Sequence, residues 1–153
     1  MSRAKRVLLG LLLVLVAIQL IRPARNKTNE VQNADFIKHF KAPAHVAEIL
    51  KISCYDCHSN NTQYPWYTNI QPVGWLMANH IKDGKEDLNF NEFGNYPKRR
   101  QLSKLKGTEN SIKDGSMPLS SYTLIHKNAN LSRENRAVIL KWTSKIIDSL
   151  SRQ

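Results

Sequence analysis

The sequence predicts an all-α fold, and two observations carry that prediction. Apolar residues recur at the three- and four-residue spacing of amphipathic helices in several segments, and no segment shows the sustained apolar-polar alternation of a half-buried strand. With six glycines and six prolines among 153 residues, the chain also lacks the composition of a disordered or collagen-like protein. One modest helical domain is therefore expected.

Residues 1–21 are expected to form a membrane-anchor helix. The 15 residues from Val7 to Ile21 are apolar except Gln19, and three basic residues precede them, as in an export signal. Fifteen helical residues span about 22 Å, less than the roughly 30 Å of the hydrocarbon core, so flanking arginines would have to reach the headgroups. The usual small-x-small cleavage site is missing, which favours an uncleaved anchor over a removed signal peptide.

The folded domain is expected at residues 34–153, because residues 22–33 are polar, contain Pro23 and read as a linker. The last helix carries the strongest pattern, with Ser132 as a candidate N-cap. Long loops are expected over residues 59–72, 87–97 and 115–131. The expected helical segments are, in chain order, Asp35 to Phe40, Pro43 up to the cysteines, Val73 to Ile81, Lys98 to Lys106, and Ser132 to the C-terminus.

The charge balance is strongly basic, at +11, but much of it belongs to the N-terminal segment. Six of the 23 basic residues lie within the first 27 positions, and the remaining 17 face 12 acidic residues, which leaves a net charge of +5. So modest a charge gives little reason to expect a nucleic-acid-binding protein. Two cysteines are too few for the multi-bridge framework of a small secreted scaffold.

Both cysteines fall in one motif, Cys54-Tyr55-Asp56-Cys57-His58, at the end of the second expected helix of the domain. The spacing C-x-x-C-H is that of a c-type haem attachment site. Two thiols on one turn can add to the two vinyl groups of a porphyrin, and the next residue brings an imidazole to the iron. Cys54 and Cys57 are therefore predicted to hold one haem c covalently, with His58 as the proximal iron ligand.

Three other interpretations of the motif are weighed. A redox-active C-x-x-C pair usually occurs in a βαβ context, which this sequence lacks. A structural zinc site needs four ligands, and no second pair of Cys or His stands at finger spacing. A structural disulfide between Cys54 and Cys57 would close too small a loop to stabilise the fold much. Haem attachment in bacteria takes place on the outer face of the inner membrane, so the domain is expected on the periplasmic side.

Met117 is the expected sixth iron ligand. It precedes Pro118 in a predicted loop on the C-terminal side, and a thioether ligand raises the reduction potential of haem relative to a second imidazole. Met77 is better interpreted as a core residue, because it lies on an apolar helical stretch. His80 and His126 are the histidines that would give a bis-histidine haem instead.

Further residues are candidates for supporting roles. The second ring nitrogen of His58 needs a fixed acceptor, and the carbonyl of Pro72 or Pro65 is a candidate. The basic triplet Lys98 to Arg100 is a candidate for balancing propionate charge, although a solvated helix start explains it better. The aromatic residues that are candidates for lining the haem are Tyr64, Trp66, Tyr67 and Tyr96.

With these motifs in place, the sequence resembles the haem-binding domain family of small, exported mono-haem c-type proteins, roughly from Pro43 to Trp142. The resemblance implies a class I cytochrome c-like helical fold with His58 and Met117 as axial ligands. The residues that carry it are Cys54-Tyr55-Asp56-Cys57-His58-Ser59-Asn60, Tyr64-Pro65-Trp66-Tyr67, Leu88-Asn89-Phe90, Met117-Pro118-Leu119, Tyr122, His126 and Trp142.

Three functional hypotheses follow. A membrane-tethered electron carrier, which is not an enzyme, would keep both axial positions filled and would exchange electrons with a redox partner protein at the membrane surface. A peroxidase or a gas or redox sensor would need an open or labile sixth position. A thiol oxidoreductase would need a reactive cysteine and no haem.

Overall fold

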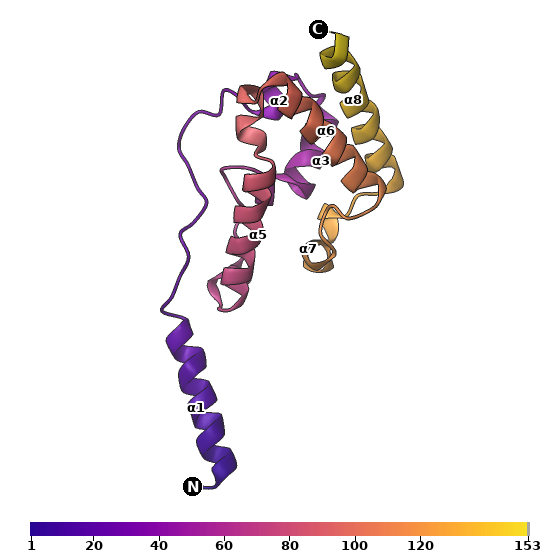
Figure 1. The fold of residues 1–153 in the computed structure, drawn as a ribbon. Helices are drawn as coiled ribbons and strands as arrows, with labels where there is room; N and C mark the ends of the chain where they lie inside the picture. Colours follow the sequence, from indigo (N-terminus) through magenta and orange to yellow (C-terminus); the bar gives the residue numbers. More distant parts are fainter. Residues whose placement is uncertain (153) are drawn as a thin grey trace.

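The computed structural model describes residues 1–152, and in this part of the chain every regular element is a helix (Figure 1). The all-α prediction is thereby confirmed. In chain order the elements are α1 (Arg3–Ile18), α2 (Phe36–His39), α3 (Ala44–Ser53), α4 (Tyr55–His58), η1 (Trp66–Asn69), α5 (Val73–Asp87), η2 (Phe90–Asn95), α6 (Lys98–Lys113), α7 (Ser120–Ile125), η3 (Lys127–Ala129) and α8 (Arg133–Arg152), where η denotes a 3₁₀ helix.

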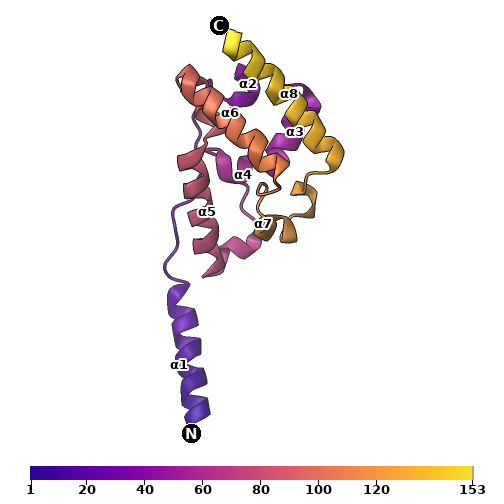
Figure 2. The same ribbon diagram turned by 45° about the vertical axis from the view of Figure 1, so that its right-hand side comes forward.

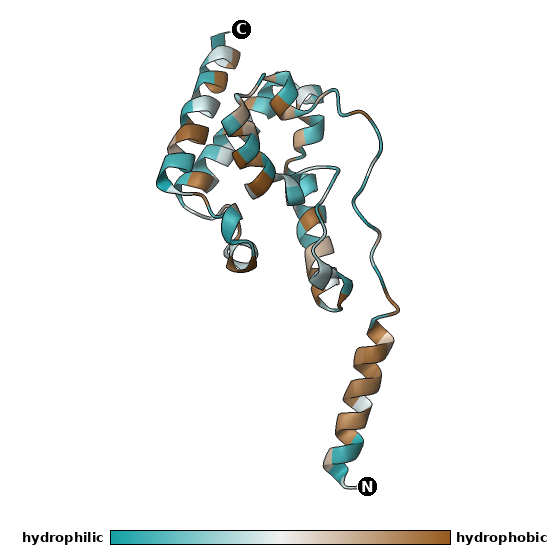
Figure 3. Cartoon of the chain, turned by 180° about the vertical axis from the view of Figure 1, so that it is seen from behind, coloured by the Kyte–Doolittle hydropathy of each residue, from teal (hydrophilic) through white to brown (hydrophobic). Residues whose placement is uncertain are grey.

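Helix α1 projects away from the rest of the molecule and buries none of its side chains (Figures 1 and 2). Its surface is apolar on all sides after the first turn (Figure 3). Its 16 residues give a length of about 24 Å. None of the helices within residues 1–152 is both long enough and apolar enough to cross a membrane, so the expected membrane-spanning anchor is corrected to a shorter helix.

The segment between α1 and α2 has no regular secondary structure, but it lies against the domain. Asn26 is its main attachment point. The side-chain amide of Asn26 donates to the carbonyl of Ser59 (2.7 Å) and the hydroxyl of Thr62 (2.9 Å), and its oxygen accepts from Lys85 Nζ (2.7 Å). The backbone N–H of Asn26 donates to the Tyr64 hydroxyl at 2.7 Å. These contacts fasten the segment across α5 and the loop that follows α4.

The main helices of the domain lie where the sequence predicts them, but two are longer. Helix α5 continues from Ile81 to Asp87, and α6 continues from Lys106 to Lys113. The end of α6 is polar except for Ile112, and the apolar pattern therefore predicts too early an end for this helix. The expected loops contain η1, η2, α7 and η3, which have at most six residues each and are too short to show a helical period. Ser132 caps α8, as expected, by accepting from the Asn135 N–H at 3.1 Å.

The core is aromatic and lies between α2, α3, η2, α6 and α8. Phe36 is 2% exposed, and its ring centroid lies 4.7 Å from that of Phe93, 5.2 Å from that of Phe90 and 5.1 Å from that of Trp142. Helices α6 and α8 pack against each other beside this cluster (Figure 2). Burial of these rings fixes α3 and η2, the two elements from which the site below is built.

Candidate haem site

The cysteine motif spans the junction of α3 and α4. Cys54 ends α3, with its N–H bonded to the Leu50 carbonyl at 2.9 Å, and its own φ of −129° turns the chain before α4 begins. The His58 N–H closes the single turn of α4 on the Cys54 carbonyl at 3.0 Å. Val46 and Leu50 are each 1% exposed, so the core holds α3 and thereby the motif in place.

Helix α5 approaches the motif closely at Gly84. A Cβ atom at this position would lie 2.9 Å from the carbonyl oxygen and 3.3 Å from the Cβ of Cys57. Neither atom can move easily, because both belong to the turn of α4. Gly84 is therefore required where α5 packs on Cys57, and the cysteine is half-buried there.

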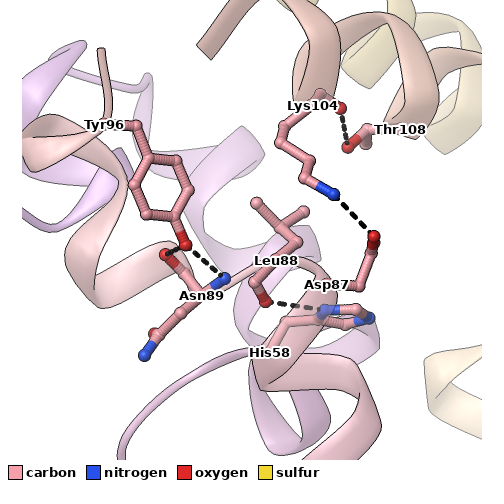
Figure 4. Close-up of polar contacts among 7 residues, drawn as sticks. All are labelled: His58, Asp87, Leu88, Asn89, Tyr96, Lys104 and Thr108. Atoms are coloured by element: carbon pink, nitrogen blue, oxygen red, sulfur yellow. Dashed lines mark hydrogen bonds and ion pairs between the residues drawn. The ribbon is translucent and has the colours of Figure 1, made fainter. Parts of the chain in front are cut away.

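The imidazole of His58 is oriented by the Leu88 carbonyl (Figure 4). A carbonyl oxygen only accepts, so the Nδ1–H of His58 donates to it at 2.9 Å, and Nε2 is left with its lone pair available for a metal. The prediction that Pro72 or Pro65 supplies this carbonyl is wrong. The acceptor is the backbone of the residue that ends α5, and a backbone group has no side-chain signature in the sequence.

A polar network holds the Leu88 carbonyl in position. The next residue, Asn89, is 3% exposed, and its N–H donates to the Tyr96 hydroxyl at 3.0 Å (Figure 4). Its amide donates to the side chains of Asn60 and Glu92, both at 2.8 Å. Because Asn60 follows the motif closely in the chain, the network ties the loop after α5 to the loop after His58. Tyr96 thus acts behind the site and is not a lining residue.

A cleft of about 380 Å³ opens beside the motif. It brings together Cys54 and His58 with Met117, although 58 positions separate His58 from Met117. Gly115 makes this possible, since its φ of +77° reverses the chain after α6, and the Met117 N–H then bonds to the Ser111 carbonyl at 3.1 Å. The other lining residues are Ser53, Asp87, Leu88, Phe90, Ser103, Lys104, Gly107, Thr108, Ser111, Ile112, Pro118 and Leu131.

The wall formed by α6 is made of small and polar residues. Gly107 lies in the middle of this wall, and a Cβ atom built there would meet no other atom within 4 Å. The protein's own packing therefore does not explain this glycine. Lys104 borders the same wall and forms an ion pair with Asp87 at 2.6 Å (Figure 4). A flat group that bound next to the imidazole of His58 would therefore have space at Gly107 and the positive charge of Lys104 beside it.

The other candidate iron ligands lie outside the cleft. Met77 is 7% exposed on α5, as the core interpretation predicts, and neither it nor His80 lines the cleft. His126 lies at another hollow, where its Nε2 contacts the Tyr67 hydroxyl and its ring stacks on Tyr122 at a centroid distance of 4.2 Å. Tyr67 and His126 therefore belong to a different cluster from Met117.

This second cluster reaches the motif through Asp56. The Tyr122 hydroxyl donates to Asp56 Oδ2 at 2.6 Å, and the Gln63 N–H donates to Oδ1 at 2.9 Å. Burial, with this hydrogen bond to Asp56, raises the pKa of Tyr122, so the hydroxyl stays protonated and keeps donating. Asp56 thus attaches α7 to the outer side of α4. Of the remaining predicted lining residues, Tyr64 binds the N-terminal segment and Trp66 is 75% exposed.

The two thiols are half-buried, and their pKa values are raised. Both cysteines are free. Burial, with a smaller contribution from Cys57, raises the pKa of Cys54 to about 12, and burial, with a contribution from Asp56, raises that of Cys57 to about 11. A thiol oxidoreductase needs a cysteine with a lowered pKa, so this chemistry has no support. No group of three or more His, Cys, Asp or Glu suited to a metal ion occurs within residues 1–152.

Comparison with known proteins agrees with this geometry. The family model described as "haem-binding domain" matches residues 13–145, which is most of the chain. The chain belongs to the haem-binding domain family. No curated protein and no solved structure matches it. The protein is therefore a haem-binding protein, and the free Nε2 of His58, the thiol of Cys54 in the same cleft and the open wall at Gly107 fit such a group.

Three features of the site were not predicted from the sequence. The Leu88 carbonyl had no signal, although Leu88-Asn89-Phe90 was among the residues that carry the family resemblance. Gly107 did have a signal in the sequence, because a glycine inside a helical pattern, here between Leu105 and Ile112, usually has a packing or functional reason. Lys104 was also missed, while the basic triplet Lys98 to Arg100 lies outside the cleft.

Proposed function

We propose that the protein is an exported mono-haem c electron carrier in which Cys54 and Cys57 hold the haem and His58 and Met117 ligate its iron. The observation that carries this proposal is the meeting of Cys54, His58 and Met117 in one cleft. When bound, the haem supplies a reversible one-electron change of its iron. A class I cytochrome c-like arrangement, implied by the family resemblance, is part of the proposal.

The chain's own residues support an electron carrier by holding both sides of the cleft still. His58 is fixed by the Leu88 carbonyl, and the loop of Met117 is fixed by Gly115, Pro118 and the bond to Ser111. Held in this way, the side chains of His58 and Met117 would keep the same positions in both oxidation states of a bound haem. They also leave no position for a substrate such as peroxide, which is why we propose a carrier and not an enzyme.

Location and partner are inferred from charge and composition. The basic N-terminus followed by the apolar α1 supports export to the periplasmic side of the bacterial inner membrane, where haem c is attached. Lys104 of α6 lines the cleft and the same helix carries further, exposed basic residues, which together would attract a redox partner protein with an acidic surface. The rate of electron exchange with such a partner should fall as salt concentration rises.

Replacement of Met117 tests the proposal. In Met117→Ala the sixth position loses its thioether, so the reduced protein should bind carbon monoxide readily and its reduction potential should fall. Met77→Ala is the matched control, because Met77 lies in α5 outside the cleft, and it should leave the potential unchanged. Ready binding of carbon monoxide by the reduced wild-type protein would instead favour a sensor or peroxidase.

A further inference from the structure

The end of the domain nearest to α1 carries a cluster of exposed apolar side chains. Trp66 on η1 is 75% exposed, Ile70 is 48% exposed, and Val73 and Leu76 in the first turn of α5 are 40% and 55% exposed. Val73 and Leu76 are three positions apart and so lie on one face of the helix. We refer to these four residues as the apolar patch. Nothing in the haem site explains it, because none of the four lines the cleft.

The apolar patch is next to the end of α1. The side chain of Gln19 accepts from the backbone N–H of Gln71 at 2.9 Å and donates to its carbonyl at 3.2 Å. The indole N–H of Trp75 donates to the Ile21 carbonyl at 2.9 Å. These three bonds join the base of α5 to the C-terminal end of α1, so the apolar surface of the helix and the apolar patch are neighbours (Figures 1 and 2).

The chemistry of this surface suits a lipid bilayer. Helix α1 exposes apolar side chains on every side, and only a surrounding apolar phase can cover such a helix completely. Tryptophan beside aliphatic residues is typical of the lipid headgroup region. The exposed Arg22 lies four residues after the end of α1 and is suited to anionic headgroups. We propose that the apolar patch docks the domain on an anionic lipid surface into which α1 inserts.

This docking would set the position of the haem site. The patch is at the first turn of α5, while Asp87 and Leu88, at the other end of the same helix, line the cleft. The 15 residues of α5 correspond to about 22 Å along its axis. The cleft would therefore lie at the far end of α5 from the lipid surface, open to a partner protein. The proposal does not depend on which group occupies the cleft.

Radiolytic hydroxyl-radical footprinting of the full haem-loaded chain tests the proposal, with vesicles of phosphatidylethanolamine and phosphatidylglycerol as the probe. The vesicles should lower the oxidation of Trp66 and Leu76 severalfold. Val31 is the internal control, because it is 75% exposed and lies in a hollow with residues of η2, which packs on α2 at the opposite end of the domain from α1 (Figure 1), and its oxidation should not change.

A matched pair of variants separates the patch from α1. In the double variant Ile70→Ser, Leu76→Ser, α1 should still be protected by vesicles, but the protection of Trp66 should be lost. The control variant Val31→Ser should behave as wild type. The proposal is overturned if vesicles protect α1 but not Trp66 in the wild-type chain, if they protect Val31 equally, or if they protect neither α1 nor Trp66.

Discussion

The aromatic core and the cleft share η2 and α6, yet the two regions are packed differently. In the core, the ring of Phe36 is surrounded by three other aromatic rings at centroid distances of 4.7 to 5.2 Å. In the cleft, a Cβ atom built on Gly107 would have no neighbour within 4 Å, and the cleft has a volume of about 380 Å³. The core is thus complete with the chain's own residues, whereas the cleft is shaped for an additional group.

The difference can be followed along α6 itself. Leu105 is 1% exposed and packs into the core, together with the half-buried Leu102. Ser103, Gly107 and Ser111 recur every four residues on the cleft side. One face of the helix therefore contributes to stability and the other to binding, and substitutions on the two faces should have separable effects.

The largest expected effect is the loss of haem attachment when both thiols are removed. The double variant Cys54→Ser, Cys57→Ser should carry no haem that survives denaturation, because no thioether can form. Haem staining of denaturing gels measures this, with His45→Gln, an exposed histidine at the start of α3, as the control. Haem that remained bound in the double variant after denaturation would contradict the account.

The Phe93→Ala variant should unfold far more easily than the wild-type protein. Phe93 is 1% exposed among the core rings, and truncation of a buried phenylalanine costs about 3–5 kcal/mol of unfolding free energy. Urea unfolding followed by circular dichroism measures the change. The control, Ile125→Ala, alters a 58% exposed side chain and should change stability by less than about 0.5 kcal/mol. A loss below about 1 kcal/mol for Phe93→Ala would show that the core is not the stabilising region.

Substitutions of Gly107 should separate binding from stability. Gly107→Ala should raise the unfolding free energy of the haem-free protein by up to about 1 kcal/mol, because alanine favours a helix, and should still permit haem loading. Gly107→Leu should keep a stable helix but fill the cleft, so the ratio of haem to protein should fall severalfold. Equal loading of the two variants would mean that the wall at Gly107 does not face the haem.

The smallest effect concerns the pH dependence of the haem-free protein. Folding raises the pKa values of Cys54 and Cys57 to about 12 and about 11, above their ordinary value, so the folded state holds these protons more tightly. Their contribution to stability is present below the unfolded pKa and is lost as pH rises above it. Urea unfolding at about pH 8 and about pH 10 should show this decrease, and the Cys54→Ser, Cys57→Ser variant should show less of it. An equal decrease in both proteins would contradict the prediction.

The sequence was most informative where side chains repeat or cluster. The spacing of apolar residues predicted α3, α5, α6 and α8, and the motif at Cys54 together with Met117 named three residues that line one cleft. The sequence was less informative where a backbone group orients a side chain, as the Leu88 carbonyl orients His58. For the N-terminal segment, hydropathy predicted a spanning helix that is not found, and it gave no sign that Gln19 and Asn26 attach the segment to the domain.

The pyridine haemochrome spectrum of the protein, expressed with a c-type maturation system and extracted with acid acetone, tests the central claim most directly. If Cys54 and Cys57 hold the haem, the chromophore will stay with the protein and its spectrum will be that of a haem with both vinyl groups converted to thioethers. Release of the haem into the acetone, with the spectrum of an unmodified porphyrin, would contradict the account.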